Sequence, residues 1–215
     1  NVVAHRLDKD PFLATFLAKH RDVIPVALGG RAAAPECKCP GGPRDVHDPR
    51  HRLPCVGYWF CKNAFRWLRK PVAAKRACDT YDGEFDVMMW VDADAHFKQL
   101  VPDDVVQGWF RKKYGCVYLK SRRTAIETGV FGYHMKLGGR KVANAVYERY
   151  ATGKFRTDAR WDDCVQMQRG IAAAKVPALD LATNVGPRNT VIQFSPLDPY
   201  LGHDKGHHLR TGKLV

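Results

Sequence analysis

The sequence predicts an α/β fold in which helices flank a mixed, mainly parallel central sheet within a single domain. Residues 1–28 read as short strand, loop, amphipathic helix and second short strand, and such alternation is typical of α/β sheets. Residues 85–91 form a continuous apolar segment of strand length, as expected for a strand buried on both faces in the middle of a sheet. The 215 residues contain no Ser/Gly linker, which favours one domain.

Local patterns place the elements of the first half. Apolar residues at helical spacing predict a helix over residues 12–20, and a short strand is expected at 24–28. Residues 31–54 are rich in Pro, Gly, Arg and His without a hydrophobic period, so we expect an irregular surface loop. Two helices follow, over 56–68 and 71–78, and the second has proline at its favoured first position.

The second half alternates strands and helices. Pro-Asp-Asp at residues 102–104 is a favourable helix start. The further expected elements are a helix to residue 111, strands at 116–119 and 130–134, helices over 141–152 and 162–174, and a strand at 178–181. From residue 196 onward the chain is rich in Gly, His and basic residues and has little regular pattern.

The composition points to a polyanionic partner. Lys and Arg number 35 against 22 Asp and Glu, which gives a formal charge of +13 and a pI near 9.6. Such an excess attracts polyanions and speeds their capture. DNA, RNA, anionic lipid surfaces and nucleotide sugars are therefore all compatible partners, and charge that serves only solubility is the simpler alternative.

Hydropathy and cysteine content bear on the compartment. No stretch reaches the roughly 18 to 20 consecutive apolar residues that a membrane-spanning helix needs, and no secretory signal follows Asn1. Seven cysteines, an odd number, disfavour a fully paired extracellular framework. We expect a cytoplasmic protein without a membrane span.

Two aspartates follow the apolar strand directly, in Asp92-Ala93-Asp94. Ligands of open α/β sheets usually bind at the carboxyl ends of strands, and side chains two residues apart share one side of an extended backbone. Two such carboxylates suit Mg²⁺ or Mn²⁺, which also bridges a diphosphate. A solvated turn or a helix cap is the structural alternative. The position after a strand favours metal ligation by Asp92 and Asp94.

Residues 196–215 supply a second part of the expected site, as a metal- and diphosphate-binding tail. His203 is a suitable third metal ligand, and Lys205, two residues on, can bind a phosphate as a point charge. Gly206 allows the backbone to approach a diphosphate closely. An unstructured basic tail is the alternative.

Four blocks of the sequence carry a family resemblance. They are VMMWVDADAHF at 87–97, AIETGVFGYHM at 125–135, RWDDCVQMQRG at 160–170 and GHDKGHHLRTGKL at 202–214. In order and spacing they resemble GT-A glycosyltransferases, in particular the bacteriophage branch of DNA hydroxymethylpyrimidine glycosyltransferases, which is related to the base J glucosyltransferase.

The resemblance implies a GT-A (Rossmann-like) fold, a UDP-sugar donor with UDP-glucose as first choice, and Mn²⁺ or Mg²⁺. The implied acceptor is a hydroxymethylated pyrimidine in DNA, and the implied place of action is the cytoplasm of the host cell. GT-A enzymes receive the nucleoside in the loop after the first strand. Asp8 and Lys9 are therefore candidate donor contacts by position.

Two carboxylates are candidates for the catalytic base. An inverting transfer needs a carboxylate that deprotonates the acceptor hydroxyl. Asp163 is the first candidate because it opens a helix, and capping that helix is its structural alternative. Glu127, in the Glu-Thr-Gly block, is the second; it could instead bind sugar hydroxyls or backbone amides. A retaining transfer requires neither residue as a base.

Basic residues around these blocks are expected to hold the phosphates of the acceptor DNA. We expect the segments that carry them to flank the cleft. These residues are Lys112, Lys120, Arg122 and Arg123.

Other interpretations remain open at this point. A glycosyltransferase could act on a cell-surface saccharide or a lipid-linked sugar, and a basic DNA-binding protein with structural aspartates would need no enzymatic activity. A structural zinc site in the expected loop, or a reduced loop without metal, would account for a further set of residues. That set is Cys37, Cys39, His47, His51, Cys55 and Cys61.

Overall fold

The protein, analysed as a computed structural model, divides into two compact units. One contains residues 1–73 and 147–166, and the other contains residues 74–146 and 167–215. The structure describes residues 10–20, 64–93, 95–120, 126–182 and 192–203. The expected loop at 31–54 with its cysteines and histidines, and the strands expected at residues 1–4 and 24–28, lie outside these ranges.

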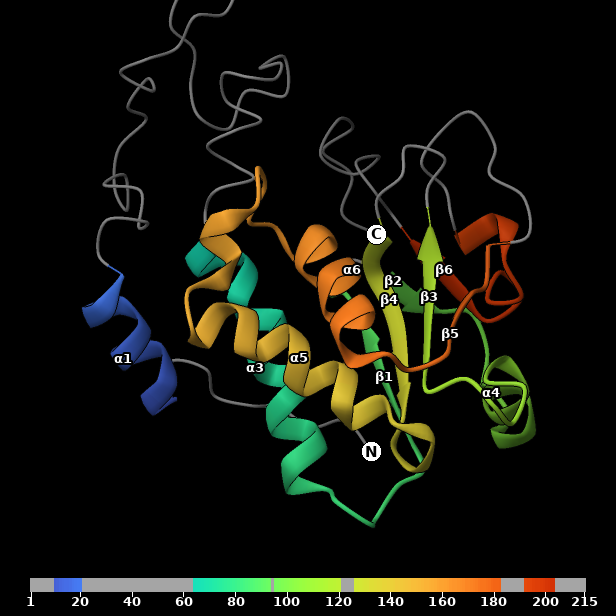
Figure 1. The fold of residues 1–215 in the computed structure, drawn as a ribbon. Helices are drawn as coiled ribbons and strands as arrows, with labels where there is room; N and C mark the ends of the chain where they lie inside the picture. The colour runs from blue at the N-terminus through green and yellow to red at the C-terminus, as the bar shows by residue number, and fades with distance from the viewer. Residues whose placement is uncertain (1–9, 21–63, 94, 121–125, 183–191, 204–215) are drawn as a thin grey trace, which may run out of the picture. The chain divides into compact units, whose positions relative to one another are not determined.

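The second unit is built on a sheet whose four described strands have the order β1-β4-β3-β5 (Figure 1). These are β1 (Val87–Val91), β3 (Cys116–Lys120), β4 (Ile126–His134) and β5 (Ala178–Asp180). β4 is antiparallel to both neighbours and β3 is parallel to β5, so β1, β3 and β5 run in one direction. The expected mixed α/β class is confirmed. The expectation of a mainly parallel sheet is wrong for the described strands, whose ladders are mostly antiparallel because β4 runs between two strands of the opposite direction.

Helices cover one face of this sheet. They are the second half of α3 (Ala64–Thr80), η3 (Met135–Leu137) with the first half of α5 (Gly139–Ala151), and the second half of α6 (Asp163–Ala174). Their apolar side chains pack with Cys116, Phe131 and Tyr133 of the strands, all nearly or fully buried. Because strand side chains alternate, these strand residues all point to the same face.

The opposite face is covered by α4 (Asp103–Trp109), η5 (Ile192–Phe194) and a two-stranded ribbon of β2 (Ala95–Phe97) and β6 (Leu201–His203). Val117 and Leu119 of β3 pack here with Leu201, and all three are buried. Burial on both faces explains the continuous apolar character of β3 and β4. β1 differs from the prediction: all five of its residues are half-buried, and within the described chain it pairs with β4 alone.

α3 is one continuous helix and contains Pro71, so the expected boundary between two helices at this proline is wrong. Proline removes a helical hydrogen bond and crowds the preceding turn. Here Leu68 and Val72 are fully buried in the core of the first unit, and Cys78 is fully buried in the second. Burial along the whole helix outweighs the local cost of the proline. Residues 56–63 are outside the described ranges.

The described part of the first unit is helical. α1 (Pro11–Lys19) begins at Asp10, whose carboxylate accepts a hydrogen bond from the backbone N–H of Phe12 at 2.8 Å, a standard N-cap. The first halves of α3 and α6, the end of α5 and η4 (Lys154–Thr157) complete the unit. Its core is aromatic, with Phe16, Tyr150 and Phe155 nearly or fully buried.

Two elements extend beyond their predicted limits. β4 starts at Ile126 rather than at residue 130, and β6 orders residues 201–203 within the expected irregular tail. The remaining predicted helices and strands of the second half agree with the structure to within a few residues at their ends. Within the described residues, no helix has both the length and the hydropathy needed to span a bilayer.

Candidate metal and donor site

The candidate site lies at one edge of the sheet in the second unit, where β1, β3 and β5 end. Their carboxyl ends carry Asp92, Lys120 and Asp180. The antiparallel β4 starts at this edge, and its second residue is Glu127. Figure 1 shows β3 pointing toward the same edge, beside β6. The fold therefore brings together Asp92, Glu127 and Lys120, which sequence reasoning proposed separately.

Asp92 is held by three hydrogen bonds. Its backbone N–H donates to the carbonyl of Gly129 at 2.8 Å, and its carbonyl accepts from the N–H of Ala95 at 3.0 Å, which closes a tight turn after β1. The indole Nε1 of Trp90 donates to Oδ1 of the Asp92 carboxylate at 2.6 Å. Trp90 is itself stacked on Phe131 of the neighbouring strand, with an interplanar angle of 5°. The carboxylate of Asp92 is thus oriented by a side chain that is fixed by packing.

β4 is irregular directly beside Asp92. Tyr118 pairs with Phe131, but the next residue of β3, Leu119, pairs with Glu127. Residues 128–130 of β4 therefore have no partner in β3. Such bulges are common next to active sites, where they redirect side chains. On its other side, β4 remains bonded to the end of β1, since the carbonyl of Gly129 accepts from the N–H of Asp92.

Glu127 is connected to Asp92 through this bulge. Its Oε1 accepts a hydrogen bond from the N–H of Gly129 at 3.3 Å, and the carbonyl of Gly129 accepts from Asp92. Glu127 is half-buried. Glu127 thus binds a neighbouring backbone amide, which is one of the alternatives to a catalytic role. It lies two residues before Gly129, whose carbonyl accepts the hydrogen bond from Asp92.

The β2–β6 ribbon brings residues 201–203 to the Asp92 turn. Ala95 pairs with His203, and Phe97 pairs with Leu201. Lys98 anchors the ribbon through its backbone N–H to the carbonyl of Tyr200 at 2.8 Å and through its ammonium group to the carboxylate of Asp198 at 3.0 Å. The backbone of His203 therefore lies opposite Ala95, the residue that follows Asp94.

Gly202 in this ribbon lies close to a side chain of the partner strand. A Cβ atom at Gly202 would collide with the imidazole of its cross-strand partner His96. The glycine allows the His96 ring to lie directly over the backbone of β6. Several residues of the predicted site lie outside the described ranges: Asp94, Lys205, Gly206, Asp8, Lys9, Arg122 and Arg123.

The structure separates the two described residues expected to bind DNA. Lys120 ends β3 at the edge that carries Asp92, whereas Lys112 precedes the amino end of β3. The five residues of β3 span about 17 Å. The expectation that Lys112 flanks the same cleft as Lys120 is therefore wrong, because the two lie at opposite ends of one strand. Phosphate binding by Lys112 stays a prediction.

Sequence reasoning missed two residues of this edge. Trp90 was not predicted as a hydrogen-bond donor to Asp92. Asp180 ends β5, and its Oδ1 accepts from the N–H of Lys120 at 3.1 Å and of Ala182 at 3.0 Å, which ties the ends of β3 and β5 together. An acidic residue at the end of a predicted strand was the available signal, the same one that identified Asp92.

Asp163 belongs to the first unit and has a different environment. Its side chain is 3% exposed and forms an ion pair with Lys70 at 3.0 Å. The preceding residue, Asp162, caps α6 by accepting from the N–H of Val165 at 3.1 Å, and it pairs with Arg160 at 2.7 Å. The helix-cap alternative thus applies to Asp162, while Asp163 is buried against a lysine.

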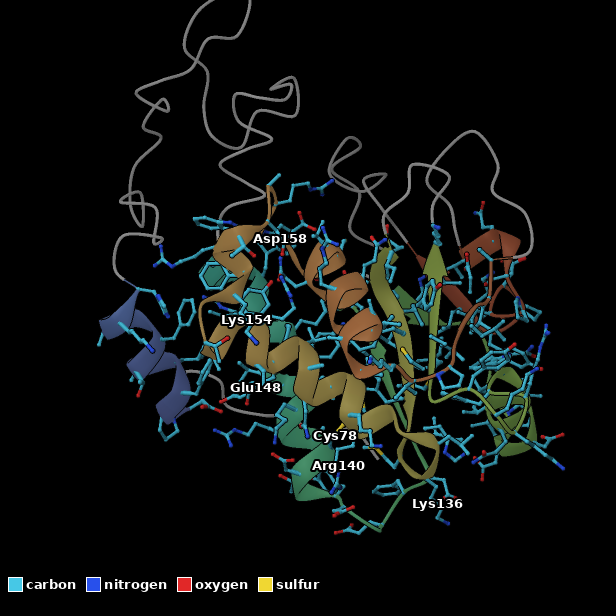
Figure 2. All side chains as sticks on the ribbon, in the orientation of Figure 1. Cys78, Lys136, Arg140, Glu148, Lys154 and Asp158 are labelled. Carbon is cyan, nitrogen blue, oxygen red and sulfur yellow. The ribbon has the colours of Figure 1, made fainter. Side chains whose placement is uncertain are left out.

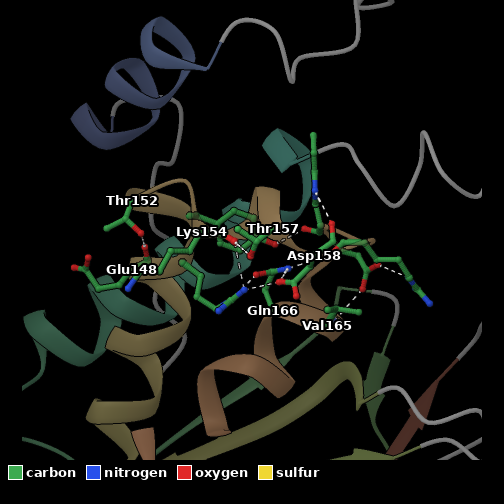
Figure 3. Close-up of polar contacts among 12 residues, drawn as sticks. Glu148, Thr152, Lys154, Thr157, Asp158, Val165 and Gln166 are labelled. Carbon is green, nitrogen blue, oxygen red and sulfur yellow. Dashed lines mark hydrogen bonds and ion pairs between the residues drawn. The ribbon is translucent and has the colours of Figure 1, made fainter. Parts of the chain in front are cut away.

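A polar network supports this end of α6 (Figure 3). Arg149 of α5 binds both the side-chain oxygen of Gln166, at 2.6 Å, and the carboxylate of Asp158. Gln166 is fully buried and donates to Asp158 and to the carbonyl of Arg160. The network holds the segment between α5 and α6 by bonds from both helices.

Among the described residues, one group of three potential metal ligands lies close together: Asp162, Asp163 and Cys164, with ligand atoms within 4.8 Å of one another. Both carboxylates already face a cation, Arg160 or Lys70. These pairs neutralise the charge that would attract a metal ion, so the group does not fit a cation site. The Asp92 carboxylate follows a strand at the ligand-binding edge of the sheet and accepts a hydrogen bond from the indole of Trp90, so it is the better candidate.

Comparison with known proteins adds no relative: the chain matches no family model, no curated protein and no solved structure.

Proposed function

We propose that the chain is a metal-dependent glycosyltransferase of the GT-A type, which moves a sugar, glucose in the first instance, from a UDP-sugar to hydroxymethylated pyrimidines in DNA. One observation carries the proposal. Three sequence blocks resemble this enzyme branch, at residues 87–97, 125–135 and 202–214, and their described residues 87–93, 95–97, 126–135 and 202–203 meet at one sheet edge although they are far apart in the chain. Asp92, Glu127 and the backbone of His203 lie at this edge.

In this proposal the metal is held by Asp92, Asp94 and His203. Hard carboxylate oxygens suit Mg²⁺ or Mn²⁺, and Trp90 orients one of them, as partners behind the metal ligands commonly do. When bound, the ion supplies positive charge that offsets the charge on the departing diphosphate. Lys205 and Gly206 contact the diphosphate, and Asp8 and Lys9 contact the nucleoside.

We favour Glu127 over Asp163 as the catalytic base. For an inverting transfer, the acceptor hydroxyl oxygen forms a bond to the anomeric carbon while its proton passes to the Glu127 carboxylate. The bond from the anomeric carbon to the diphosphate oxygen breaks, and its electron pair leaves with UDP. Glu127 lies at the edge that carries Asp92, whereas the near-complete burial of Asp163 against Lys70 supports a structural role.

The test is transfer of labelled glucose from UDP-glucose to a duplex that contains hydroxymethylcytosine, in the presence of Mn²⁺. We expect transfer by the wild-type protein, loss of activity in Asp92→Asn and Glu127→Gln, and little change in the control Asp103→Asn, whose carboxylate is exposed in the first turn of α4. Failure to label this DNA, together with transfer to a saccharide or lipid-linked acceptor, would overturn the nucleic-acid part.

Absence of transfer to every acceptor and of UDP-glucose hydrolysis, with DNA binding unaffected by Asp92→Asn, would instead favour the non-enzymatic interpretation. The proposed site of action, the host cytoplasm, follows from the resemblance and the charge.

A further inference from the structure

The backbone is strained at three basic residues. Among the described residues, the non-glycine positions with positive φ are Arg111 at 46°, Lys112 at 54° and Lys175 at 52°. Left-handed backbone is unfavourable for residues with a Cβ and is normally taken by Gly, Asn or Asp. Local conflicts between sequence and structure are most often found at functional sites.

Arg111 and Lys112 form the centre of a tight turn after α4. The N–H of Lys113 donates to the carbonyl of Phe110 at 3.1 Å, and positive φ at both central residues is the signature of a type I′ turn. This turn strongly favours Asn-Gly at its centre. Here the chain has two long cationic side chains at positions where their backbone conformation is disfavoured.

Lys175 repeats the pattern at the end of α6, which finishes at Ala174. The first residue after a helix is often in the left-handed conformation and is then usually glycine. A lysine in its place is again the less stable choice. In both turns, basic residues therefore occupy left-handed backbone positions where glycine or asparagine is usual.

Both turns lie at one edge of the second unit. Lys112 stands four residues before β3 and Lys175 stands three residues before β5, and these two strands are parallel neighbours in which Cys116 pairs with Ala178. The N–H of Gly115 donates to the carbonyl of Pro177 at 2.9 Å, so the segments that follow the turns are in direct contact. This edge is opposite to the one that carries Asp92.

The basic side chains at this edge are exposed and have no acidic partner. In the part of the chain that the structure describes, Arg111, Lys112, Lys113 and Lys175 form no ion pair. The acids that precede β1 are already matched, Asp82 with Arg140 and Asp86 with Lys136; Lys136 and Arg140 are labelled in Figure 2. The positive charge of the turns is therefore not neutralised by these acids.

We propose that Arg111, Lys112, Lys113 and Lys175 form a phosphate-binding surface for the backbone of the acceptor nucleic acid. This proposal rests on the proposed function and adds a second surface, apart from the Asp92 edge, at which the protein contacts the acceptor nucleic acid. β3 separates the surface from the Asp92 edge by about 17 Å, which corresponds to about five phosphates along one strand of a duplex. With a modified base at Asp92, the basic residues would then contact backbone phosphates several nucleotides away from that base.

The test variant is Lys112→Gly/Lys175→Gly, which removes two charges and also relieves the backbone strain, because glycine accepts positive φ. The matched control, Lys19→Gln/Lys154→Gln, removes two charges from exposed positions elsewhere. Binding to a 24-base-pair duplex with one hydroxymethylcytosine is measured by fluorescence anisotropy across a salt series, in EDTA and without donor. The melting temperature of each protein is measured in parallel.

We expect the test variant to melt at or above the wild-type temperature and to bind the duplex at least tenfold more weakly at low salt. The slope of log affinity against log salt should fall by about 2, near 0.9 for each lost phosphate contact, while the control should keep most of the wild-type affinity and slope. Equal loss in the two variants would overturn the surface, because it would indicate general charge alone. Retained DNA binding with lost binding to phosphatidylserine vesicles would also overturn it, in favour of a membrane surface.

The outcome is separable from that of the proposed function, because no metal or donor is present in the binding assay. If sugar transfer fails while the test variant selectively loses DNA binding, the enzyme proposal falls and the phosphate surface stands. If transfer succeeds and the variant binds like the control, the surface falls and the enzyme proposal stands. In an active protein, the variant should raise KM for the duplex and leave kcat unchanged, with no effect on a free hydroxymethylated nucleoside.

Discussion

Replacing Trp90 with phenylalanine should weaken metal binding at Asp92. The indole Nε1 that donates to the Asp92 carboxylate at 2.6 Å is lost, while an aromatic ring remains to pack on Phe131. The substitution therefore removes the group that orients the carboxylate and leaves the carboxylate in place.

The magnitude follows from the type of bond. A hydrogen bond to an ionised acceptor contributes about 1.5–3 kcal/mol, which corresponds to about a 10- to 150-fold change in an equilibrium constant. Loss of a partner behind a metal ligand commonly lowers metal affinity about 10- to 100-fold. The two ranges agree, so we expect Trp90→Phe to raise the Kd for Mn²⁺ by about 10- to 100-fold.

The assay is titration of free Mn²⁺ by electron paramagnetic resonance at fixed UDP. Trp161→Phe is the matched control, since its indole also donates a hydrogen bond, to the carbonyl of Asp158 at 3.2 Å, in the other unit. An unchanged Kd in Trp90→Phe, or an equal rise in both variants, would refute the proposed orientation of Asp92.

Three further predictions concern stability. Asp163→Asn should lower the free energy of unfolding by about 3 kcal/mol, because it removes the buried carboxylate that pairs with Lys70. In urea denaturation, adding Lys70→Met should recover part of this loss. If the effects of the two substitutions simply add, the ion pair does not contribute as proposed. Burial raises the pKa of Cys78 from 9.0 to about 12. The thiol of the unfolded chain therefore ionises first as the pH rises, and the free energy of unfolding should fall between these pH values. This decline should be shallower in Cys78→Ala. Gly202→Ala requires the exposed imidazole of His96 to move, so we expect it to destabilise the protein by at most about 1 kcal/mol, and equal destabilisation in a His96→Ala background would refute the clash.

The elements that the sequence predicts well are those with local signals. α1 has apolar residues at helical spacing, and α4 starts with Pro-Asp-Asp, which places two acids in its first turn; both signals act within a few residues. The helix break predicted at Pro71 fails because the decisive term is burial on both sides of the proline, which depends on distant parts of the chain.

The candidate site was predictable in its residues more than in its geometry. The Asp92 motif stood out because an apolar strand precedes it, whereas the start of β4 at Ile126 was hidden by the bulge at 128–130, where Thr-Gly reads as a turn. β6 is three residues long and is stable only by pairing with β2. The misplacement of Lys112 was avoidable, since a residue before a parallel strand lies at the amino end and not at the ligand-binding edge.

The β2–β6 pairing also has a consequence for the order of folding. β2 is made early, directly after the Asp92 turn, but its partner is separated from it by more than 100 residues of chain. Contacts of such long sequence separation close late, because the entropy of loop closure must be met first. During synthesis the sheet can form before the ribbon, so the region around Asp92 is completed only when residues 201–203 have left the ribosome. A nascent chain that stops before residue 201 should have its sheet but not the ribbon that borders this site.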